Sequence, residues 1–423
     1  MDIESGQFVF THIEPYEVIN VVRNTLGRID TRIMEHGERV AFIVSEMLEF
    51  SGNPGGLDRD KLFILSALHD IGAYKTEEID RLVSFDGNDL NDHAIYGYLF
   101  LKNMSHLGDC SEAVLYHHTP YRQLKSPDCG YGEYAGIIHL ADRADILLMQ
   151  GDKSALKRLR PLAGEIFDPE LCELFFRADA ERKICERLFS GEYRAVVESS
   201  VRALVLSERD VWEYLKMLAY ALDFRSEYTV AHTVNTTAIS MALGKLVGLS
   251  VSDMELLYCG AFLHDLGKIA IPISILEKPG SLTPAEGDVM RTHVVVTDEI
   301  LRGVVSDDIR LIAARHHEKL NGRGYPEGLA AAELTTLQRI VAIADILSAL
   351  VSRRSYKVPF GKDKVMDIIT LHRNRGELDP ELCDLTLAFY DSIMAESAKS
   401  REPVEALYGS IKKAFAELSA RMG

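Results

Sequence analysis

The histidines and aspartates of this chain recur in two ordered series whose chemistry suits metal binding. Imidazole and carboxylate groups without thiolates are ligands for iron, manganese and similar divalent ions. Both series have the order His, His-Asp, His, His-His, Asp, and corresponding members lie about 200 residues apart. Ten of the 14 histidines belong to these series, which indicates a duplicated domain. The first series comprises His36, His69, Asp70, His93, His117, His118 and Asp142, and the second comprises His232, His264, Asp265, His293, His316, His317 and Asp345.

Each series holds more ligands than one ion can coordinate. Five histidines and two carboxylates suit a pair of divalent ions about 3.5–4 Å apart that share a bridging carboxylate. Such a pair lowers the pKa of bound water, and the resulting hydroxide can attack phosphorus. The sequence therefore predicts two divalent transition-metal ions per site, with iron or manganese favoured over a structural zinc.

The segments that carry these residues have the pattern of buried helices. An apolar run over residues 256–263 ends at His264-Asp265, and the first half repeats this arrangement before His69-Asp70. Asp142 and Asp345 each follow an apolar helical run, which places a carboxylate on a buried face. A buried carboxylate costs free energy unless it meets a cation, so these positions favour metal binding over a packing role.

The second half resembles an HD-GYP domain, the subset of the HD phosphohydrolase superfamily that cleaves cyclic dinucleotides. The resemblance covers residues 218–390, and its ordered motifs are far more specific than a His-Asp pair alone. The matching motifs are Tyr228-Thr229-Val230-Ala231-His232, His264-Asp265-Leu266-Gly267-Lys268-Ile269, His293, His316-His317-Glu318-Lys319-Leu320-Asn321-Gly322-Arg323-Gly324-Tyr325-Pro326, Asp345 and Arg354-Ser355-Tyr356-Lys357.

The resemblance implies a role for each matching residue. Asp265 and Lys268 are the implied catalytic residues: Asp265 bridges the ions, and Lys268 neutralises charge on phosphorus or protonates the leaving oxygen. One ion is implied at His232, His264, Asp265 and Asp345, and the other at Asp265, His293, His316 and His317. The candidate substrate-binding residues are Arg323, Gly324, Tyr325, Arg354 and Lys357. Arg323 can pair with phosphate, whereas Tyr325 either stacks on a base or braces the loop.

Two positions depart from the family pattern. Some members place a carboxylate four residues before the first histidine and hold three metals, whereas this chain has Tyr228 there, beside Glu227, which favours two. The family often repeats an Asp three residues after its last ligand, whereas this chain has Ser348. We expect that replacement to remove a hydrogen bond to a ligand.

The first half resembles a plainer HD domain. Its ligand series is complete, but Ala73 stands at the position that matches Lys268, and the Gly-Tyr-Pro loop is missing. Buried histidines and carboxylates are costly to retain without a cation, so we expect a second metal site with a different specificity. A smaller phosphomonoester, cleaved as by a 5′-nucleotidase, would suit this site, and a sensory role is the alternative.

The chain of 423 residues is expected to be all-α, with two tandem HD-type helical bundles joined by a helical linker. We expect an N-terminal diverged HD domain over residues 1–190, a helical connector over 191–225 and an HD-GYP domain with a C-terminal helix over 226–423. Residues 395–403 predict a break before a last amphipathic helix at 404–422, which would pack or form a homodimer. The six scattered cysteines indicate free thiols in a reducing compartment.

Charge and motifs together limit the function. The net charge of −17 disfavours DNA and anionic membranes as partners, and the absence of a basic leader or a long apolar run favours the cytoplasm. The leading hypothesis is metal-dependent hydrolysis of a cyclic dinucleotide, cyclic di-GMP or 3′,3′-cyclic GMP-AMP, to a linear dinucleotide. The alternatives are a non-catalytic signalling scaffold that binds a nucleotide or protein partners, and a hydrolase of another nucleotide.

Overall fold

A computed structural model describes residues 15–29, 31–53, 56–73, 91–124, 131–151, 153–225, 232–352 and 359–422. Within these ranges the chain forms α-helices and short 3-10 helices, and it has no β-strand longer than an isolated bridge. The expected all-α class is confirmed. None of the described helices combines the length and the apolar character that spanning a bilayer requires.

The chain packs as two compact units. Among the described residues, the N-terminal unit contains residues 26–217 and those from 411 onwards, and the C-terminal unit contains residues up to 25 and residues 218–410. The unit boundaries fall inside the helices α1 (Pro15–Ile29), α13 (Glu208–Arg225) and α22 (Tyr390–Met422). The predicted domain boundaries at residues 190 and 225 stay a prediction.

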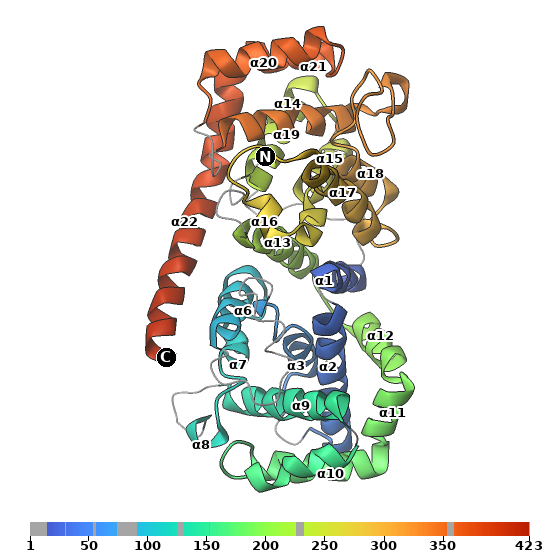
Figure 1. Cartoon of the computed structure of the whole chain (residues 1–423), viewed down its shortest axis with the longest axis vertical. Coiled ribbons are helices and arrows are strands. Elements are labelled where there is room, and N and C mark those ends of the chain that lie inside the picture. The colour runs from blue at the N-terminus through green and yellow to red at the C-terminus, as the bar shows by residue number, and fades with distance from the viewer. Residues whose placement is uncertain are drawn as a thin grey trace. The chain divides into compact units, whose positions relative to one another are not determined.

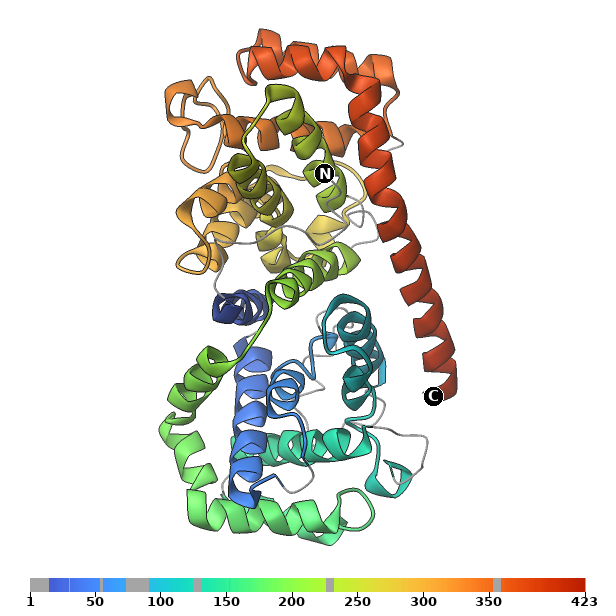
Figure 2. The same ribbon diagram turned by 180° about the vertical axis from the view of Figure 1, so that it is seen from behind.

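The N-terminal unit is built around α2 (Thr31–Ser51), which packs against α3 (Arg59–Ala67) and α9 (Gly132–Gln150). Figures 1 and 2 show α9 crossing α2, with the green helices α10, α11 and α12 following one another around the outside of this pair. The other elements are α6 (Asn91–Met104), η2 (Gly108–Ser111), α7 (Glu112–Leu115), α8 (Tyr121–Leu124), η3 (Lys153–Arg158), η4 (Arg160–Leu162), α10 (Pro169–Arg182), α11 (Ile184–Ser190) and α12 (Tyr193–Ala203).

The C-terminal unit is built around α14 (His232–Val247), α15 (Val251–Leu263) and α19 (Thr336–Val351). Ile239, Leu257 and Ile343, one from each helix, are fully buried in one apolar cluster. The other elements are η5 (Leu266–Ala270), α16 (Ile273–Leu276), α17 (Pro284–Leu301), α18 (Asp307–Ala314), η6 (Ala331–Glu333), α20 (Lys362–Asn374) and α21 (Pro380–Ala388).

The turn after each His-Asp pair packs tightly against the helix that carries the next histidine. A Cβ atom on Gly267 would lie 1.9 Å from the carbonyl oxygen of His293, and one on Gly72 would lie 2.1 Å from that of His93. Only glycine allows such a close backbone approach. The two glycines therefore bring the His-Asp pair and the following histidine of each series together.

The last helix differs from the prediction. α22 runs without interruption from Tyr390 to Met422, so the break expected over residues 395–403 is wrong. Pro403 removes one helical hydrogen bond, but side chains on both sides of it are anchored. Ser397 Oγ donates to Asn235 Oδ1 at 2.8 Å, and the Tyr408 hydroxyl donates to the Tyr220 carbonyl at 2.6 Å. Tertiary packing on both sides of the proline thus overrides its low helix propensity.

Candidate metal centres

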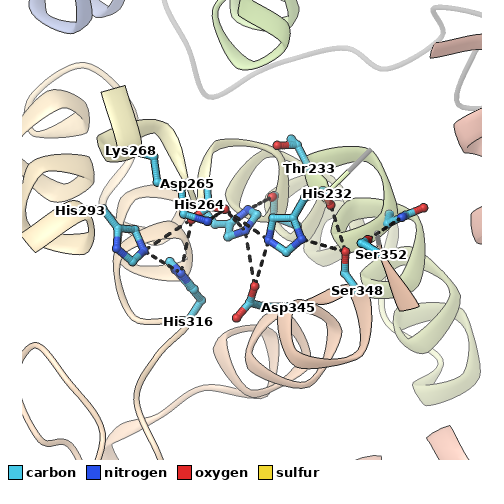
Figure 3. A network of polar contacts seen from close by, with 12 residues as sticks. His232, Thr233, His264, Asp265, Lys268, His293, His316, Asp345, Ser348 and Ser352 are labelled. Carbon is cyan, nitrogen blue, oxygen red and sulfur yellow. Dashed lines mark hydrogen bonds and ion pairs between the residues drawn. The ribbon is translucent and has the colours of Figure 1, made fainter. Parts of the chain in front are cut away.

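The seven predicted ligands of the second series meet at one place in the C-terminal unit. His232 begins α14, the adjacent pair His264-Asp265 follows α15, and His293 lies in α17. His316 and His317 follow α18, and Asp345 lies in α19. Capping boxes begin α17 and α19 and so fix two of the ligand-bearing helices. Figure 3 shows His293 and His316 on one side of Asp265 and His232 on the other.

The two oxygens of Asp265 face different pairs of histidines. Oδ2 lies 3.3 Å from His232 Nε2 and 3.2 Å from His264 Nε2. Oδ1 lies 3.4 Å from His293 Nε2 and 3.9 Å from His316 Nε2. A carboxylate between two imidazole pairs has the arrangement of a ligand that bridges two metal ions.

Asp345 completes the set from α19. Its Oδ1 lies 3.1 Å from His232 Nε2, and its Oδ2 lies 3.6 Å from His317 Nδ1. Burial alone would raise the pKa of Asp345, but the hydrogen bond with His232 and the positive potential of the neighbouring histidines hold the pKa well below its ordinary value. The side chain is therefore available as a carboxylate.

Backbone hydrogen bonds fix the tautomers of three of the histidines. The Nδ1 atoms of His264, His293 and His316 each lie 2.7 Å from the carbonyl oxygen three residues earlier. A carbonyl oxygen only accepts, so each Nδ1 carries the proton and each Nε2 presents a lone pair. His293 Nε2 and His316 Nε2 are 3.4 Å apart, and two such lone pairs cannot hydrogen-bond to each other. A cation near both nitrogens would satisfy them.

The first series gathers in a similar way in the N-terminal unit, except that His69 Nε2 lies nearest the Asp70 oxygen that faces His93 and His117, at 3.5 Å. Asp70 Oδ1 lies 3.3 Å from His93 Nε2 and 3.7 Å from His117 Nε2, whereas Asp70 Oδ2 lies 3.9 Å from His36 Nε2. His36 Nε2 also lies 3.2 Å from Asp142 Oδ1. Asp70 thus occupies the bridging position that Asp265 occupies in the second series.

Both sets fit divalent cations. The potential ligand atoms form four groups, each with its atoms within 4.8 Å of one another. These groups are His232, His264 and Asp265; His293, His316 and His317; His36, His69 and Asp142; and Asp70, His93, His117 and His118. Among the described residues, His264 Nε2, Asp265 Oδ1, His69 Nε2 and Asp70 Oδ1 are buried without a hydrogen-bond partner. Buried polar atoms rarely stay unpaired, and bound cations would supply their partners.

Burial keeps several of these histidines neutral, as metal ligation requires. Desolvation lowers the pKa of His69 and of His293 to about 4. His36 differs, because hydrogen bonds with Asp142 and Asp145 outweigh desolvation and raise its pKa to about 10. A metal ion at His36 therefore has to displace a proton near neutral pH.

In each series, the first histidine is hydrogen-bonded to a side chain that lies three residues after the final aspartate. His232 Nδ1 lies 2.9 Å from Ser348 Oγ, and His36 Nδ1 lies 2.7 Å from Asp145 Oδ2. The expectation that Ser348 removes a hydrogen bond to a ligand is wrong, because the serine hydroxyl is long enough to reach the imidazole. The spacing of Asp145 after Asp142 was the signal for its role.

A buried carboxylate holds the loop that follows His317. Glu318 accepts hydrogen bonds from the backbone N–H groups of Glu327, Gly328 and Leu329 at 2.7, 3.1 and 2.9 Å. A Cβ atom on Gly324 would lie 2.4 Å from the Cα atom of Glu318, so this position requires glycine. No role was expected for Glu318 from the sequence, although an acid next to His-His within the motif was a usable signal.

The structure describes some of the predicted substrate-binding residues, and these lie on the loop that follows His317. The Tyr325 ring lies 4.7 Å from the His317 ring, and the Tyr325 backbone N–H donates to the His317 carbonyl at 3.3 Å, so Tyr325 braces the loop against the predicted metal ligand His317. Arg323 is exposed on the same loop, and Lys268 Nζ contacts Asp265 Oδ2. Arg354 and Lys357 lie outside the described residues, as do Glu227 and Tyr228.

The N-terminal site has a cation at a different position. Ala73, at the position that matches Lys268, is fully buried. Arg143, next to Asp142 in the sequence, donates to Asp142 Oδ2 through Nε at 3.0 Å and Nη2 at 2.8 Å. The second series has Ile346 at this position. Sequence reasoning missed Arg143, although a basic residue directly after a predicted ligand was visible.

Comparisons with known proteins agree with this duplicated architecture. Residues 33–147 and residues 216–382 each match the HD domain family. The 3′3′-cGAMP-specific phosphodiesterase 1 of Vibrio cholerae is 26% identical over 403 residues, which cover 89% of this chain and 93% of that protein. The cyclic di-GMP phosphodiesterase response regulator RpfG of Xanthomonas campestris is 39% identical over 179 residues, which cover 41% of this chain and 47% of that protein.

A solved structure supports the fold. The crystal structure of a cyclic GMP-AMP-specific phosphodiesterase of Vibrio cholerae, V-cGAP3, superposes with a TM-score of 0.56 at 19% identity, and the match covers 92% of this chain and 98% of that chain. The sequence matches to two HD domains, and to one relative over nearly its whole length, agree with the two cages formed by the two series of histidines and aspartates. The chain therefore belongs to the HD domain family and contains two HD domains.

Proposed function

We propose that the C-terminal unit hydrolyses a cyclic dinucleotide to a linear dinucleotide in a metal-dependent reaction. The observation that carries this proposal is the position of Asp265 between two pairs of histidines, with the Lys268 ammonium group against the same carboxylate. The relatives are named for 3′3′-cGAMP and for cyclic di-GMP, and the proposal includes both as candidate substrates.

The residues of the site would have three different roles in this reaction: metal binding, stabilisation of charge and substrate binding. His232, His264, Asp265 and Asp345 would hold one divalent ion, and Asp265, His293, His316 and His317 would hold a second, with iron or manganese favoured. When bound, the ions supply Lewis acidity and a water of lowered pKa. Lys268 stabilises negative charge that develops on the phosphoryl oxygens or protonates the leaving oxygen. Arg323, Gly324, Tyr325, Arg354 and Lys357 would bind the substrate.

We also propose a second phosphohydrolase activity in the N-terminal unit. Its ligand cage is complete and buried, yet Ala73 stands where Lys268 stands in the second site, and the chain has no Gly-Tyr-Pro loop after His118. A site without that loop suits a smaller substrate. The terminal 5′-phosphate of the linear product is the simplest phosphomonoester that this chain would generate.

We also propose that the protein acts in the cytoplasm. Five cysteines in the described part of the chain are free and buried, which supports a reducing compartment and thus the cytoplasm. A homodimer and signalling protein partners are compatible with the chain, and size-exclusion chromatography with light scattering would test the former.

The decisive experiment uses the anaerobically purified protein, a panel of cyclic dinucleotides and chromatography of the products. We expect His264→Ala to abolish ring opening, because it removes a ligand of the second cage. We expect His69→Ala to retain ring opening and to accumulate the phosphorylated linear product.

Two results would contradict the proposal. If the metal-loaded wild-type protein cleaves no cyclic dinucleotide of the panel, the signalling scaffold or a hydrolase of another nucleotide becomes the better reading. If His69→Ala leaves the final product unchanged, the N-terminal unit has no 5′-nucleotidase activity.

A further inference from the structure

His232 is oriented differently from three other histidines of its cage. His264, His293 and His316 donate from Nδ1 to carbonyl groups three residues earlier. His232 is the first residue of α14, and its Nδ1 lies 2.9 Å from the hydroxyl of Ser348 in α19. The orientation of this one imidazole therefore depends on a side chain of another helix.

The hydrogen bonds around Ser348 fix the direction of each proton. Ser348 Oγ donates its proton to the His232 carbonyl oxygen at 3.2 Å. The hydroxyl oxygen must then accept from Nδ1–H of His232. Nε2 of His232 faces Asp265 and Asp345, at 3.3 and 3.1 Å, and an ion that binds there would take the place of the proton that Nε2 shares with Asp345. Ser348 is itself fully buried, so water does not compete for its hydroxyl.

The N-terminal cage shows the same position occupied by a stronger acceptor. His36 Nδ1 lies 2.7 Å from Asp145 Oδ2, and Arg39 holds Asp145 through hydrogen bonds of 2.7 and 3.0 Å. Asn235 stands where Arg39 stands, three residues after the first histidine. The carboxylate and its arginine are thus replaced together in the second cage by a serine and an asparagine.

These acceptors differ in what they do to an imidazole ligand. A carboxylate that accepts from one ring nitrogen raises the basicity of the other, whereas a hydroxyl orients the ring and adds little charge. Loss of such an outer hydrogen bond typically weakens metal binding by about 10- to 100-fold.

We propose that Ser348 is a positioning residue that sets how tightly an ion is held by His232, His264 and Asp345. With serine at this position the three ligands hold the ion more loosely than they would with a carboxylate there. The inference rests on the proposed metal-dependent function. According to this inference, one side chain, Ser348, controls the binding affinity of one of the two ions that the proposed reaction needs.

The test measures ion binding rather than turnover. Metal-free full-length protein is titrated with Mn²⁺, and the ions retained per chain are counted by mass spectrometry after equilibration with graded chelator. We expect Ser348→Ala to weaken one ion by at least about tenfold and to leave the others unchanged, and Ser348→Asp to tighten that ion by about tenfold. Ser348→Thr keeps the hydroxyl and should retain wild-type binding.

Ser352→Ala is the matched control. Ser352 lies one turn further along the chain, and its Oγ accepts from Asn235 Nδ2 at 3.3 Å without contacting His232. This variant removes a hydroxyl between the same two segments, so it should lower the thermal midpoint without changing the retention of any ion. If Ser348→Ala is too unstable to titrate, Ser348→Cys, of similar size and weaker as an acceptor, replaces it.

The outcomes separate this inference from the proposed function. Wild-type retention of every ion in Ser348→Ala, or equal loosening in Ser352→Ala, would overturn the role of Ser348 even if cyclic dinucleotides are cleaved. A selective loss in Ser348→Ala, with no cyclic dinucleotide cleaved by the wild-type protein, would support Ser348 and count against the proposed substrate alone.

Discussion

Gly267 lies so close to His293 that a Cβ atom at position 267 would be 1.9 Å from the carbonyl oxygen of residue 293. The backbone N–H of Gly267 also donates to Thr297 Oγ1 at 2.8 Å, which joins the turn after Asp265 to the helix of His293. The spacing of the two groups of ligands thus depends on the absence of a side chain.

Gly267→Ala should therefore destabilise the protein and lower its metal content. Overpacking against backbone atoms typically costs about 1–3 kcal/mol, and relief of the clash would move Asp265 away from His293. Thermal unfolding and metal analysis test this together. Gly287→Ala in α17, the helix that carries His293, is the control. A Cβ atom at position 287 meets no atom within 4 Å, so this variant should be neutral or stabilising. Equal behaviour of the two variants would contradict the argument.

Glu318→Ala should weaken substrate binding more than metal binding. It leaves the three backbone N–H groups of residues 327–329 without their acceptor, and unsatisfied donors of this kind cost about 1–3 kcal/mol each. We expect KM for the cyclic dinucleotide to rise by about tenfold or more, with wild-type ion content. Glu327→Ala, which removes only an exposed ion pair with Arg315, should change KM little. A normal KM in Glu318→Ala would show that the loop needs no such anchor.

Lys268→Met should lower kcat without loss of bound metal. The ammonium group contacts Asp265 but belongs to no ligand group, and removal of a charge-stabilising donor typically costs about 10²–10³ in kcat. Steady-state kinetics and metal analysis measure the two effects separately. Lys245→Met is the control, since Lys245 pairs with Glu396 on the surface. If Lys268→Met loses an ion, the lysine supports the ligands rather than the reaction.

Metal-free protein should lose stability as the pH falls below about 6.5. The pKa of His69 and of His293 is about 4 in the folded chain, because burial disfavours the imidazolium form. Between these pH values the unfolded chain binds more protons, so the free energy of unfolding decreases by about 1.4 kcal/mol per pH unit for each such histidine. His36 does not add to this slope, since its pKa is raised to about 10 and it stays protonated throughout the window.

Thermal midpoints at pH 6.5, 5.7 and 5.0 measure that slope, in a range of about 1.5 pH units that lies above the ordinary carboxylate pKa values. His293→Asn keeps a polar side chain and removes one titrating group, so the pH dependence of its thermal midpoint should be shallower than in the wild type. A wild-type midpoint that is constant over this range would mean that the histidines are already protonated in the folded protein.

The sequence was sufficient to predict the helical class, the duplication and the gathering of both ligand series, because these follow from residue types at repeated spacings. The hydrogen bond of Ser348 and the anchoring of α22 around Pro403 were predicted wrongly. Both depend on the distance between helices far apart in the chain, and neither helix alone encodes that distance. Glu318 was overlooked because its partners are backbone N–H groups of a loop whose path the sequence does not give. Arg143 was overlooked although its partner Asp142 is the preceding residue.

The unit boundaries inside α22 have a practical consequence for dissecting this protein. Phe415, in the part of α22 that belongs to the N-terminal unit, stacks on Tyr96 of α6 at 4.1 Å between ring centroids, on the helix that also carries His93. Residues 15–25 of α1 belong in turn to the C-terminal unit. If the chain were divided at one point between the two repeats, the N-terminal piece would lack the end of α22 and the C-terminal piece would lack the start of α1. No single truncation therefore yields both units intact.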